Sequence, residues 1–424
     1  MTAPAHAQPL NPFASANPHA LATILEASET KTIIASRDIF DLQGIKLWAR
    51  NQPVSGELQR KLMDRQLKNP LESCLLAEDG VTATQLVQAT QALVEADTPL
   101  SAWLRPHAAK LVREAAQIPL HSVVQLLLTA AQASRPEAYD HALKAMALAG
   151  ALMLGSGGGT PEVRLAMIGG LVHDLGEVYI DPRHGEADAD RNLDFTSYQQ
   201  LVVHPHVSLL LLAQLTNYPA SLARAVGEHH ERGDGSGYPH ALRKEGMSPL
   251  GRLLAVTEAA LGVLRGEHPQ LARVSVALRV VPGEFDLTWV GRVGEIAAAH
   301  SPLQGQLELA QVQRRLARLD AALQLAQQTT MSLLGTAESA AMKDALTLAQ
   351  HLLGRLRAGW YASGLWSSEA VTVHDAAEVE AVEDELFFRL RGISRAAQLR
   401  AGQLPPNDAA KLGQLCGALE AIGK

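Results

Sequence analysis

The sequence predicts a mainly α-helical fold, and three observations support this prediction. Aromatic residues make up only 4% of the 424 residues, so the core must rest on Leu, Ala and Val, a mixture that favours helices. Apolar residues recur at helical spacing almost throughout residues 115–300. Two pairs, Thr160-Pro161 and Ser248-Pro249, combine a capping residue with a proline in the first helical turn.

The length of the chain indicates several folded units. At roughly 100–200 residues per domain, 424 residues correspond to about two to four domains. We predict a flexible lead-in over residues 1–28, a small α+β module over 29–110, a helical domain over 111–300 and a C-terminal helical extension over 301–424.

The predicted α+β module begins with two β-prone runs, residues 32–40 and 45–48, on either side of a glycine-containing turn. This pattern is typical of a β-hairpin. Ser55 then follows as a candidate helix cap, with Leu58 and Leu62 spaced for one helix face. The module contains no residue that we identify as catalytic.

The C-terminal region continues the helical pattern. Further helices are predicted over residues 340–358 and 377–402. The pattern lacks the charged pairs that are typical of a coiled coil, and this lack favours packed helix faces. The apolar residues near helical spacing at its start are Leu307, Val312, Leu316, Leu319 and Leu323.

Composition excludes several classes of protein. A net charge of −7 argues against a binder of DNA or RNA polymers, because neutralising phosphates requires an excess of Lys and Arg. With only Cys74 and Cys416, neither a disulfide framework nor a cysteine zinc site is expected. Residues 1–10 do not resemble a secretory signal, and the most apolar run, 145–154, is half the ~20 residues of a membrane span. We therefore expect a soluble cytoplasmic protein that does not enter membranes.

Histidines are concentrated in the centre of the chain, where seven of the 16 fall within residues 141–230. Neutral imidazoles and carboxylates bind divalent transition metals, and a carboxylate beside a His can bridge two ions. Helices that each offer one or two such groups could hold two ions about 3.5–4 Å apart, an arrangement that activates water for phosphoester cleavage. The groups placed early in a helix or at a helix boundary are His141, His173-Asp174, His204 before Pro205, and His229-His230.

The segment from His229 to Pro239, HHERGDGSGYP, is the most specific pattern in the chain. It resembles the signature of HD-GYP domains, bacterial members of the HD phosphohydrolase superfamily that hydrolyse cyclic di-GMP. The resemblance covers residues from about 120 to 265, and the order His, His-Asp, His, His-His suits the family. An HD-type helical domain is therefore implied for the centre of the chain.

The resemblance also implies a set of metal ligands. Glu258 stands where the family helix carries Asp, and it retains a carboxylate one methylene longer. Glu137, one helical turn before His141, is either a ligand of a third ion or a solvated carboxylate at a helix start. Two divalent ions are implied, or three with Glu137, and iron or manganese is favoured. The other implied ligands are His141, His173, Asp174, which bridges the ions, His204, His229 and His230.

Asp174 and Glu177 are the candidate catalytic residues. Glu177 stands where the family has a Lys that meets the substrate phosphate, so it removes an attraction for phosphate; alternatively it reaches a metal. His184 and His206 are interpreted as structural or surface residues. Two Gly allow the 235–239 loop to turn tightly and form a rim of the site. The candidate substrate-binding residues are Arg232, Asp234, Gly235, Gly237, Tyr238 and Pro239.

The function that the resemblance implies is a metal-dependent phosphodiesterase that hydrolyses cyclic di-GMP in bacterial second-messenger signalling. Glu177 and Glu258 motivate an alternative, a catalytically weak or inactive receptor or scaffold that binds a cyclic dinucleotide or partner proteins. The signature counts against a third option, a phosphohydrolase for another nucleotide. The expected partner is a cyclic dinucleotide, and a homodimer or a signalling protein partner also stays open.

Overall fold

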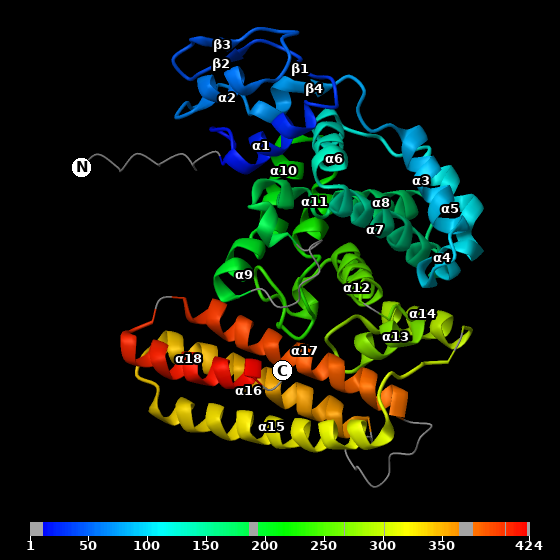
Figure 1. Cartoon of the computed structure of the whole chain (residues 1–424), viewed down its shortest axis with the longest axis vertical. Coiled ribbons are helices and arrows are strands. Elements are labelled where there is room, and N and C mark those ends of the chain that lie inside the picture. Colours follow the sequence, from blue (N-terminus) through cyan, green and yellow to red (C-terminus); the bar gives the residue numbers. More distant parts are fainter. Residues whose placement is uncertain are drawn as a thin grey trace.

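Helices form most of the part of the chain that the structure describes, which confirms the predicted fold class. The computed structural model describes residues 12–185, 194–266, 268–300, 302–363, 376–402 and 404–421. Figure 1 shows a small strand-containing module at the top, a helical centre, and a layer of long helices at the bottom. Among the described helices, none combines the length and the apolar character that a membrane crossing requires.

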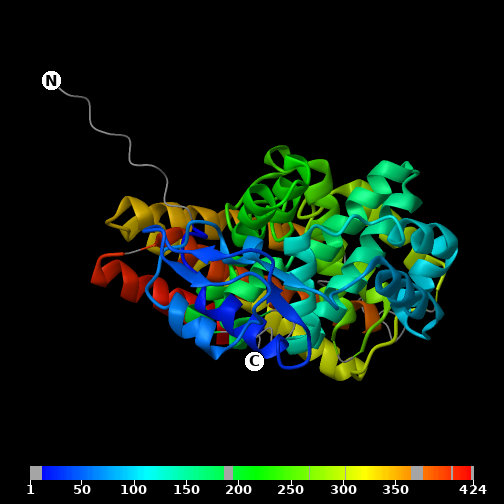
Figure 2. The ribbon, with the colours of Figure 1, turned by 90° about the horizontal axis from the view of Figure 1, so that it is seen from above.

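The N-terminal module contains two small antiparallel sheets. Strand β2 pairs with β3, which confirms the predicted hairpin, whereas β1 pairs with β4. Seen from above in Figure 2, this blue module lies in front of the helical centre. The elements of the module are α1 (Pro18–Ala27), β1 (Ile33–Ala35), β2 (Ile39–Phe40), β3 (Lys46–Trp48), α2 (Gly56–Leu62) and β4 (Leu75–Ala77).

Part of the predicted lead-in is folded. Asn17 caps α1 through its Oδ1, which accepts hydrogen bonds from the backbone of His19 and Ala20. Leu21 and Ile24 are buried in the core of the N-terminal module. The structure therefore differs from a flexible lead-in through residue 28, because a capped amphipathic helix occupies residues 18–27; residues 1–11 lie outside the described residues.

Helices α3 (Ala83–Glu95) and α4 (Pro99–Leu104) fall within the module predicted for residues 29–110, and α5 (Ala108–Ala115) begins within it. Their buried residues Leu86, Trp103 and Leu111 instead join the core of the central domain. The cores thus divide closer to residue 80 than to residue 110. These helices have apolar faces that need a large helical surface to cover them, which the small sheets do not offer.

The central domain is built around α7 and α8, which lie close together. A Cβ at Gly170 on α8 would collide with the backbone of Ala145 and Met146 on α7, so only glycine permits this approach. The helices of the domain are α6 (Ser122–Ser134), α7 (Pro136–Gly155), α8 (Thr160–Val172), α9 (Phe195–Leu201), α10 (His204–Leu215), α11 (Ala220–Gly227), α12 (Pro249–Leu264), α13 (Leu271–Arg279) and α14 (Leu287–Ala298).

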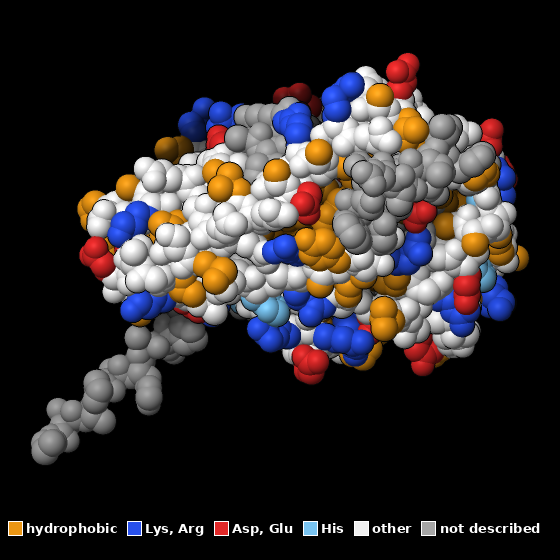
Figure 3. Space-filling model, turned by 90° about the horizontal axis from the view of Figure 1, so that it is seen from below, with side chains coloured by type: hydrophobic (Ala, Val, Ile, Leu, Met, Phe, Trp, Pro, Cys, Tyr) orange, Lys and Arg blue, Asp and Glu red, His pale blue; other side chains and the backbone are white. Residues whose placement is uncertain are grey.

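Four long helices form the C-terminal layer, which has its own core. The helices predicted over residues 340–358 and 377–402 are both present. On the underside shown in Figure 3, hydrophobic and charged side chains of the described residues are interspersed. Helix α15 exposes the side chains of Leu325 and Met331. The four helices are α15 (Leu309–Thr336), α16 (Ala340–Ala362), α17 (Ala376–Ala401) and α18 (Pro406–Ala421).

Helix α13 joins the central domain to the C-terminal layer. Leu271, Val274 and Leu278 belong to the core of the central domain. Val276 and Val280 belong to the C-terminal core. Because one helix buries residues in both cores, the two parts are packed together rather than only linked by chain.

The close packing of α7 and α8 yields a stability prediction. We expect Gly170→Ala to destabilise the protein by roughly 2–4 kcal/mol, because the added methyl must push α7 and α8 apart. Chemical denaturation measures this change. The matched control is Gly291→Ala on α14, where a Cβ meets nothing within 4 Å, and it should be neutral or stabilise by up to about 1 kcal/mol. Equal effects of the two substitutions would contradict the interpretation.

A buried carboxyl group in the C-terminal layer yields a pH prediction. The Glu383 side chain on α17 is fully enclosed, and its Oε2 lies 3.5 Å from Arg315 Nε. Burial raises the pKa of Glu383 to about 8, from 4.5, although Arg315 acts in the opposite direction. The folded chain therefore holds one more proton than the unfolded chain between these pH values. This contribution to stability is fully present below pH 4.5 and is lost as the pH rises to about 8.

We expect wild-type stability to fall by up to about 1.4 kcal/mol per pH unit across that window relative to Glu383→Gln. Urea denaturation of both proteins at pH 5 and pH 8 measures the difference. The exposed Glu378, on the same helix, supplies the control Glu378→Gln, which should keep the wild-type decline. A pH slope unchanged in Glu383→Gln would show that this carboxyl group is not the cause.

Candidate metal centre

Side chains able to bind a metal converge from five segments of the central domain. Pro205 stands in the first turn of α10 and so begins that helix at His204, while α11 ends at Gly227 just before a His pair. Ser248 caps α12 by accepting a hydrogen bond from Gly251 N. The side chains and their segments are His141 (α7), His173 and Asp174 (the end of α8), His204 (α10), His229 and His230 (after α11), and Glu258 (α12).

These side chains form two groups that share one residue. In each group, one potential ligand atom per residue lies within 4.8 Å of all the others. We call them the His229 group, which contains Asp174, His204, His229 and His230, and the Glu258 group, which contains His141, His173, Asp174 and Glu258. The sequence-predicted ligands are thus brought together, with the exception of Glu137.

Asp174 faces both groups, one carboxylate oxygen to each. Its Oδ1 lies 3.1 Å from His229 Nε2 and 3.3 Å from His204 Nε2. Its Oδ2 lies 3.0 Å from His173 Nε2 and 3.4 Å from His141 Nε2. Asp174 therefore presents one oxygen to each group, which is the orientation that a bridging ligand would need.

Backbone carbonyl groups orient three of the imidazoles. The Nδ1 atoms of His173, His204 and His229 lie 2.7, 2.8 and 2.5 Å from the carbonyl oxygens three residues earlier in the chain. A carbonyl oxygen only accepts, so each Nδ1 donates its proton to it. In the neutral form of such a ring, the lone pair of Nε2 is directed into the centre, which is the usual arrangement of a metal-binding histidine.

The donor atoms fit a divalent transition metal. The Nε2 atoms of His204 and His229 are 3.1 Å apart, and two lone pairs at that distance repel each other unless a cation lies between them. With His230 and Asp174 Oδ1, they offer the imidazole and carboxylate donors that such ions prefer. The His229 group is therefore a suitable site for one ion.

Burial keeps the His229 and His230 rings neutral. It lowers the pKa of His229 to about 4, although Asp174 acts in the opposite direction. Burial also lowers the pKa of His230, and the neighbouring His229 and His204 lower it further. Neutral rings at physiological pH are ready to bind a metal, since no proton has to leave first.

Carboxylates give the Glu258 group the opposite character. Burial acts to lower the pKa of His141, but Glu258 and Asp174 together outweigh it and raise the pKa to about 9. Burial would raise the pKa of Glu258, yet His141, His173 and Arg265 hold it well below its usual range. In this group, ionised carboxylates face a protonated imidazole across 2.8 Å, from His141 Nε2 to Glu258 Oε2.

Arg265 adds a further cation beside the Glu258 group, and sequence reasoning missed it. Its Nη2 lies 3.2 Å from His141 Nδ1 and 3.4 Å from Glu258 Oε1. The signal was available, because Arg265 follows Glu258 by seven residues and so lies two turns away on the same face of α12. A guanidinium in this position opposes a second cation in the same group.

The 235–239 loop rests directly on the His229 group. The Tyr238 ring stacks on His230 with ring centroids 4.5 Å apart. Both carboxylate oxygens of Glu231 accept hydrogen bonds from the segment that follows the loop, from His240 N and Leu242 N, each at 2.7 Å. A Cβ at Gly237 would collide with the backbone of residues 230–232, which explains the glycine at this position. The loop therefore forms a rim of the centre, as expected.

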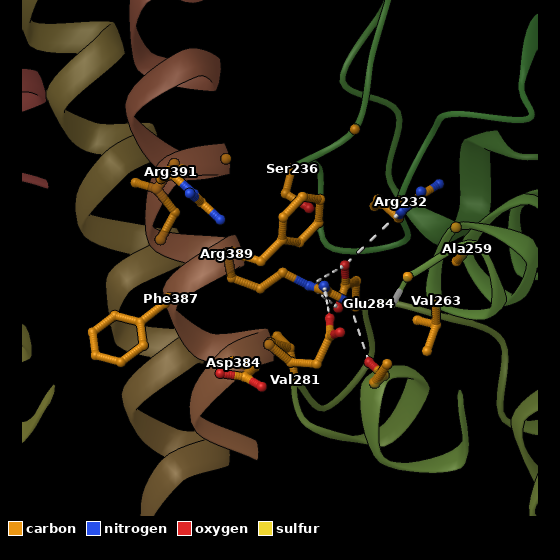
Figure 4. Close-up of a pocket in the computed structure, with 18 of the residues that line it drawn as sticks. Arg232, Ser236, Ala259, Val263, Val281, Glu284, Asp384, Phe387, Arg389 and Arg391 are labelled. Atoms are coloured by element: carbon orange, nitrogen blue, oxygen red, sulfur yellow. Dashed lines mark hydrogen bonds and ion pairs between the residues drawn. The ribbon is translucent and has the colours of Figure 1, made fainter. Parts of the chain in front are cut away.

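A cavity of about 670 Å³ opens beside the centre. His230 and Glu258 lie in its wall together with the predicted substrate-binding residues Arg232 and Tyr238. Its opposite wall comes from α17 (Figure 4), a contribution that the sequence did not reveal. The volume is within the range of roughly 300–1,000 Å³ that is typical of small-molecule sites.

Two other sequence candidates, Glu137 and Glu177, lie outside the two groups, as do two histidines that were interpreted as structural or surface residues. Glu137 is exposed, so it is a solvated carboxylate at the start of α7. Glu177 is 4% exposed, but it neither joins a group nor lines the described cavity, which gives no support to its predicted catalytic role. His206 packs its ring against His240, and His184 ends a short 3₁₀ turn.

Comparison with known proteins agrees with this geometry. Residues 128–280 match the HD domain family. A cyclic di-GMP phosphodiesterase of Pseudomonas aeruginosa is 31% identical over 154 residues, which is 36% of each chain. A 3'3'-cGAMP-specific phosphodiesterase of Vibrio cholerae is 26% identical over 106 residues, 25% of this chain and 22% of that one. No solved structure matches the chain.

The chain spans only about a third of the first relative and a fifth of the second, and the matched part is the one that holds the candidate centre. The HD match includes all the residues of the two groups, and it contains the signature at residues 229–239. These matches support an HD domain of the phosphohydrolase type, and of the HD-GYP kind, over the central part of this chain.

Proposed function

We propose that the protein is a metal-dependent phosphodiesterase that hydrolyses cyclic di-GMP in bacterial second-messenger signalling. The observation that carries this proposal is the pair of four-residue groups that share Asp174. Two adjacent sites joined by one carboxylate suit a reaction in which both the attacking and the leaving oxygen need stabilisation. The names of the two relatives support a cyclic dinucleotide as the substrate class.

Each group would hold one ion. His204, His229 and His230 would supply three imidazoles to the first, and His141, His173 and Glu258 would supply the donors of the second. Asp174 would contribute one oxygen to each. Bound divalent ions supply Lewis acidity and a readily deprotonated water, and the mixed nitrogen and oxygen donors favour iron or manganese.

The residues of the cavity would place the substrate. Arg232 stacks its guanidinium 4.9 Å from the Phe285 ring centroid, which holds it in the cavity wall as a cation for a phosphate. Tyr238 presents an aromatic ring beside the His229 group and suits a purine base. The enclosed position of the centre limits the access of bulk water to the reacting phosphodiester.

A receptor that binds the nucleotide without cleaving it is the second candidate. Arg265 favours it, because its guanidinium lies against both His141 and Glu258, where a second ion would bind. A centre that holds only one ion would keep its ligand-binding surface and lose much of its hydrolytic power. Turnover distinguishes the two candidates.

Metal counting tests the centre. We expect wild-type protein reconstituted with manganese to hold two ions per chain by elemental analysis, and Asp174→Ala to hold few, because both groups lose a shared ligand. His229→Ala should lose one ion. Cyclic di-GMP hydrolysis, followed by chromatography, should fall by more than about 100-fold in Asp174→Ala. Removing a residue that only supports a metal ligand already lowers activity by about 10- to 100-fold, and removing the ligand itself should lower it further.

The control for these variants is His206→Ala, which removes an imidazole that lies in neither group. It should keep both ions and wild-type turnover. One ion per chain with tight nucleotide binding but no cleavage would select the receptor, whereas full metal content in Asp174→Ala would refute the proposed centre.

Arg265 yields a separate prediction. We expect Arg265→Ala to raise the affinity for the second manganese ion by about tenfold, because a like charge is removed from the Glu258 group. Calorimetric metal titration measures this change. The matched control on the same helix is Arg252→Ala, whose guanidinium pairs with Asp286 and should leave both affinities unchanged. An unaltered second affinity in Arg265→Ala would mean that this cation does not oppose metal binding.

A further inference from the structure

The cavity beside the metal centre has two walls that come from different parts of the chain. The HD domain supplies one wall, which includes His230 and Glu258. Helix α17 of the C-terminal layer supplies the other, which includes Phe388, Arg391 and Arg395. In Figure 4, Arg391 extends from α17 into the space between that helix and Ser236. A ligand that fills the cavity therefore touches both walls.

A chain of aromatic rings connects α17 to the centre. The guanidinium of Arg395 lies 4.9 Å from the centroid of the Tyr198 ring. Tyr198 meets Tyr238 edge to face at 5.7 Å, and Tyr238 stacks on His230. Only two tyrosine rings thus separate a cation of the C-terminal layer from a residue of the His229 group.

Ion pairs hold α17 in this position. Arg389 on α17 lies 3.0 Å from Glu284 and donates a hydrogen bond to the carbonyl of Ala277, so it reaches both the 280s segment and α13. Arg273 on α13 pairs in turn with Glu380 at 2.9 Å. These partners are buried or nearly so, and burial strengthens such pairs compared with the surface. The wall is therefore part of the folded structure.

The charge of α17 changes along its length. Its first half carries the acids Glu380, Asp384 and Glu385, which face Arg273, Arg315 and Arg389. From residue 389 to residue 400 the helix has four arginines and no acid. The half of α17 that reaches Tyr198 is thus the cationic half.

We propose that α17 completes the substrate site, with Arg391 and Arg395 binding the phosphate of the cyclic dinucleotide that does not lie at the metal centre. A cyclic dinucleotide carries two phosphodiester anions, and only one of them can be at the ions when it is cleaved. The guanidinium group binds phosphate through two parallel hydrogen bonds, which suits the second anion. This inference rests on the proposed function, because it assumes that substrate.

The test uses the full-length protein and two readouts. The dissociation constant for cyclic di-GMP is measured by calorimetry, and KM and kcat are measured for hydrolysis. In Arg391→Ala and Arg395→Ala we expect the dissociation constant and KM to rise roughly 10- to 100-fold, as befits the loss of charge-assisted hydrogen bonds. Metal content should stay at the wild-type value and kcat should change little, because the reacting phosphate is at the other wall.

Two further variants separate binding from folding. Arg391→Lys and Arg395→Lys keep the charge and should recover a large part of the affinity. Arg400→Ala is the matched control on the same helix, because Arg400 pairs with Asp344 at 2.6 Å and lies outside the cavity wall. Its affinity for cyclic di-GMP should equal that of the wild type.

The outcomes are distinct. Unchanged or tighter binding in the alanine variants, with turnover intact, would overturn the inference and leave the proposed function standing; tighter binding would mean that α17 obstructs the site. A wild-type protein that holds its metals but neither binds nor cleaves cyclic di-GMP or 3'3'-cGAMP would overturn the proposed function, and the inference with it.

Discussion

The central constraint in this molecule is a single buried carboxylate that must satisfy imidazoles on two sides. Asp174 is the only residue common to both groups, and its two oxygens lie between 3.0 and 3.4 Å from four different rings. An anion so enclosed is costly unless positive charge surrounds it. The packing of five segments around Asp174 therefore depends on compensating its charge as well as on apolar contacts.

Two simple devices meet this constraint. Glycine at position 170 lets α8 approach α7, which brings His173 beside His141. Backbone carbonyls then fix the tautomer of three rings without using any further side chain. The two groups differ in charge as a result of their neighbours: burial dominates around His229, and carboxylates dominate around His141. The same kind of side chain thus acquires two different protonation states within one site.

The sequence allowed the convergence of the candidate ligands to be predicted because its signals are local. A His-Asp pair that closes an apolar helical run, and the HHERGDGSGYP segment, each place their side chains without reference to distant residues. Arg265 could have been found by extending the helical spacing of α12 two turns beyond Glu258. The α17 wall could not be predicted, because it depends on pairs such as Arg389 with Glu284, 105 residues apart. The packing of α3–α5 against the central core was missed for a related reason. An amphipathic pattern shows that one face of a helix is buried, but it does not show which other element covers that face.

The shared helix α13 has a consequence for how a ligand is received. Because it buries Val274 in one core and Val276 in the other, opening the space between the two parts would expose apolar surface to solvent. The width of the cavity is consequently set during folding, before any ligand binds. Such preorganisation spares the complex the entropic cost of arranging its walls, and it makes molecular size a criterion of selection.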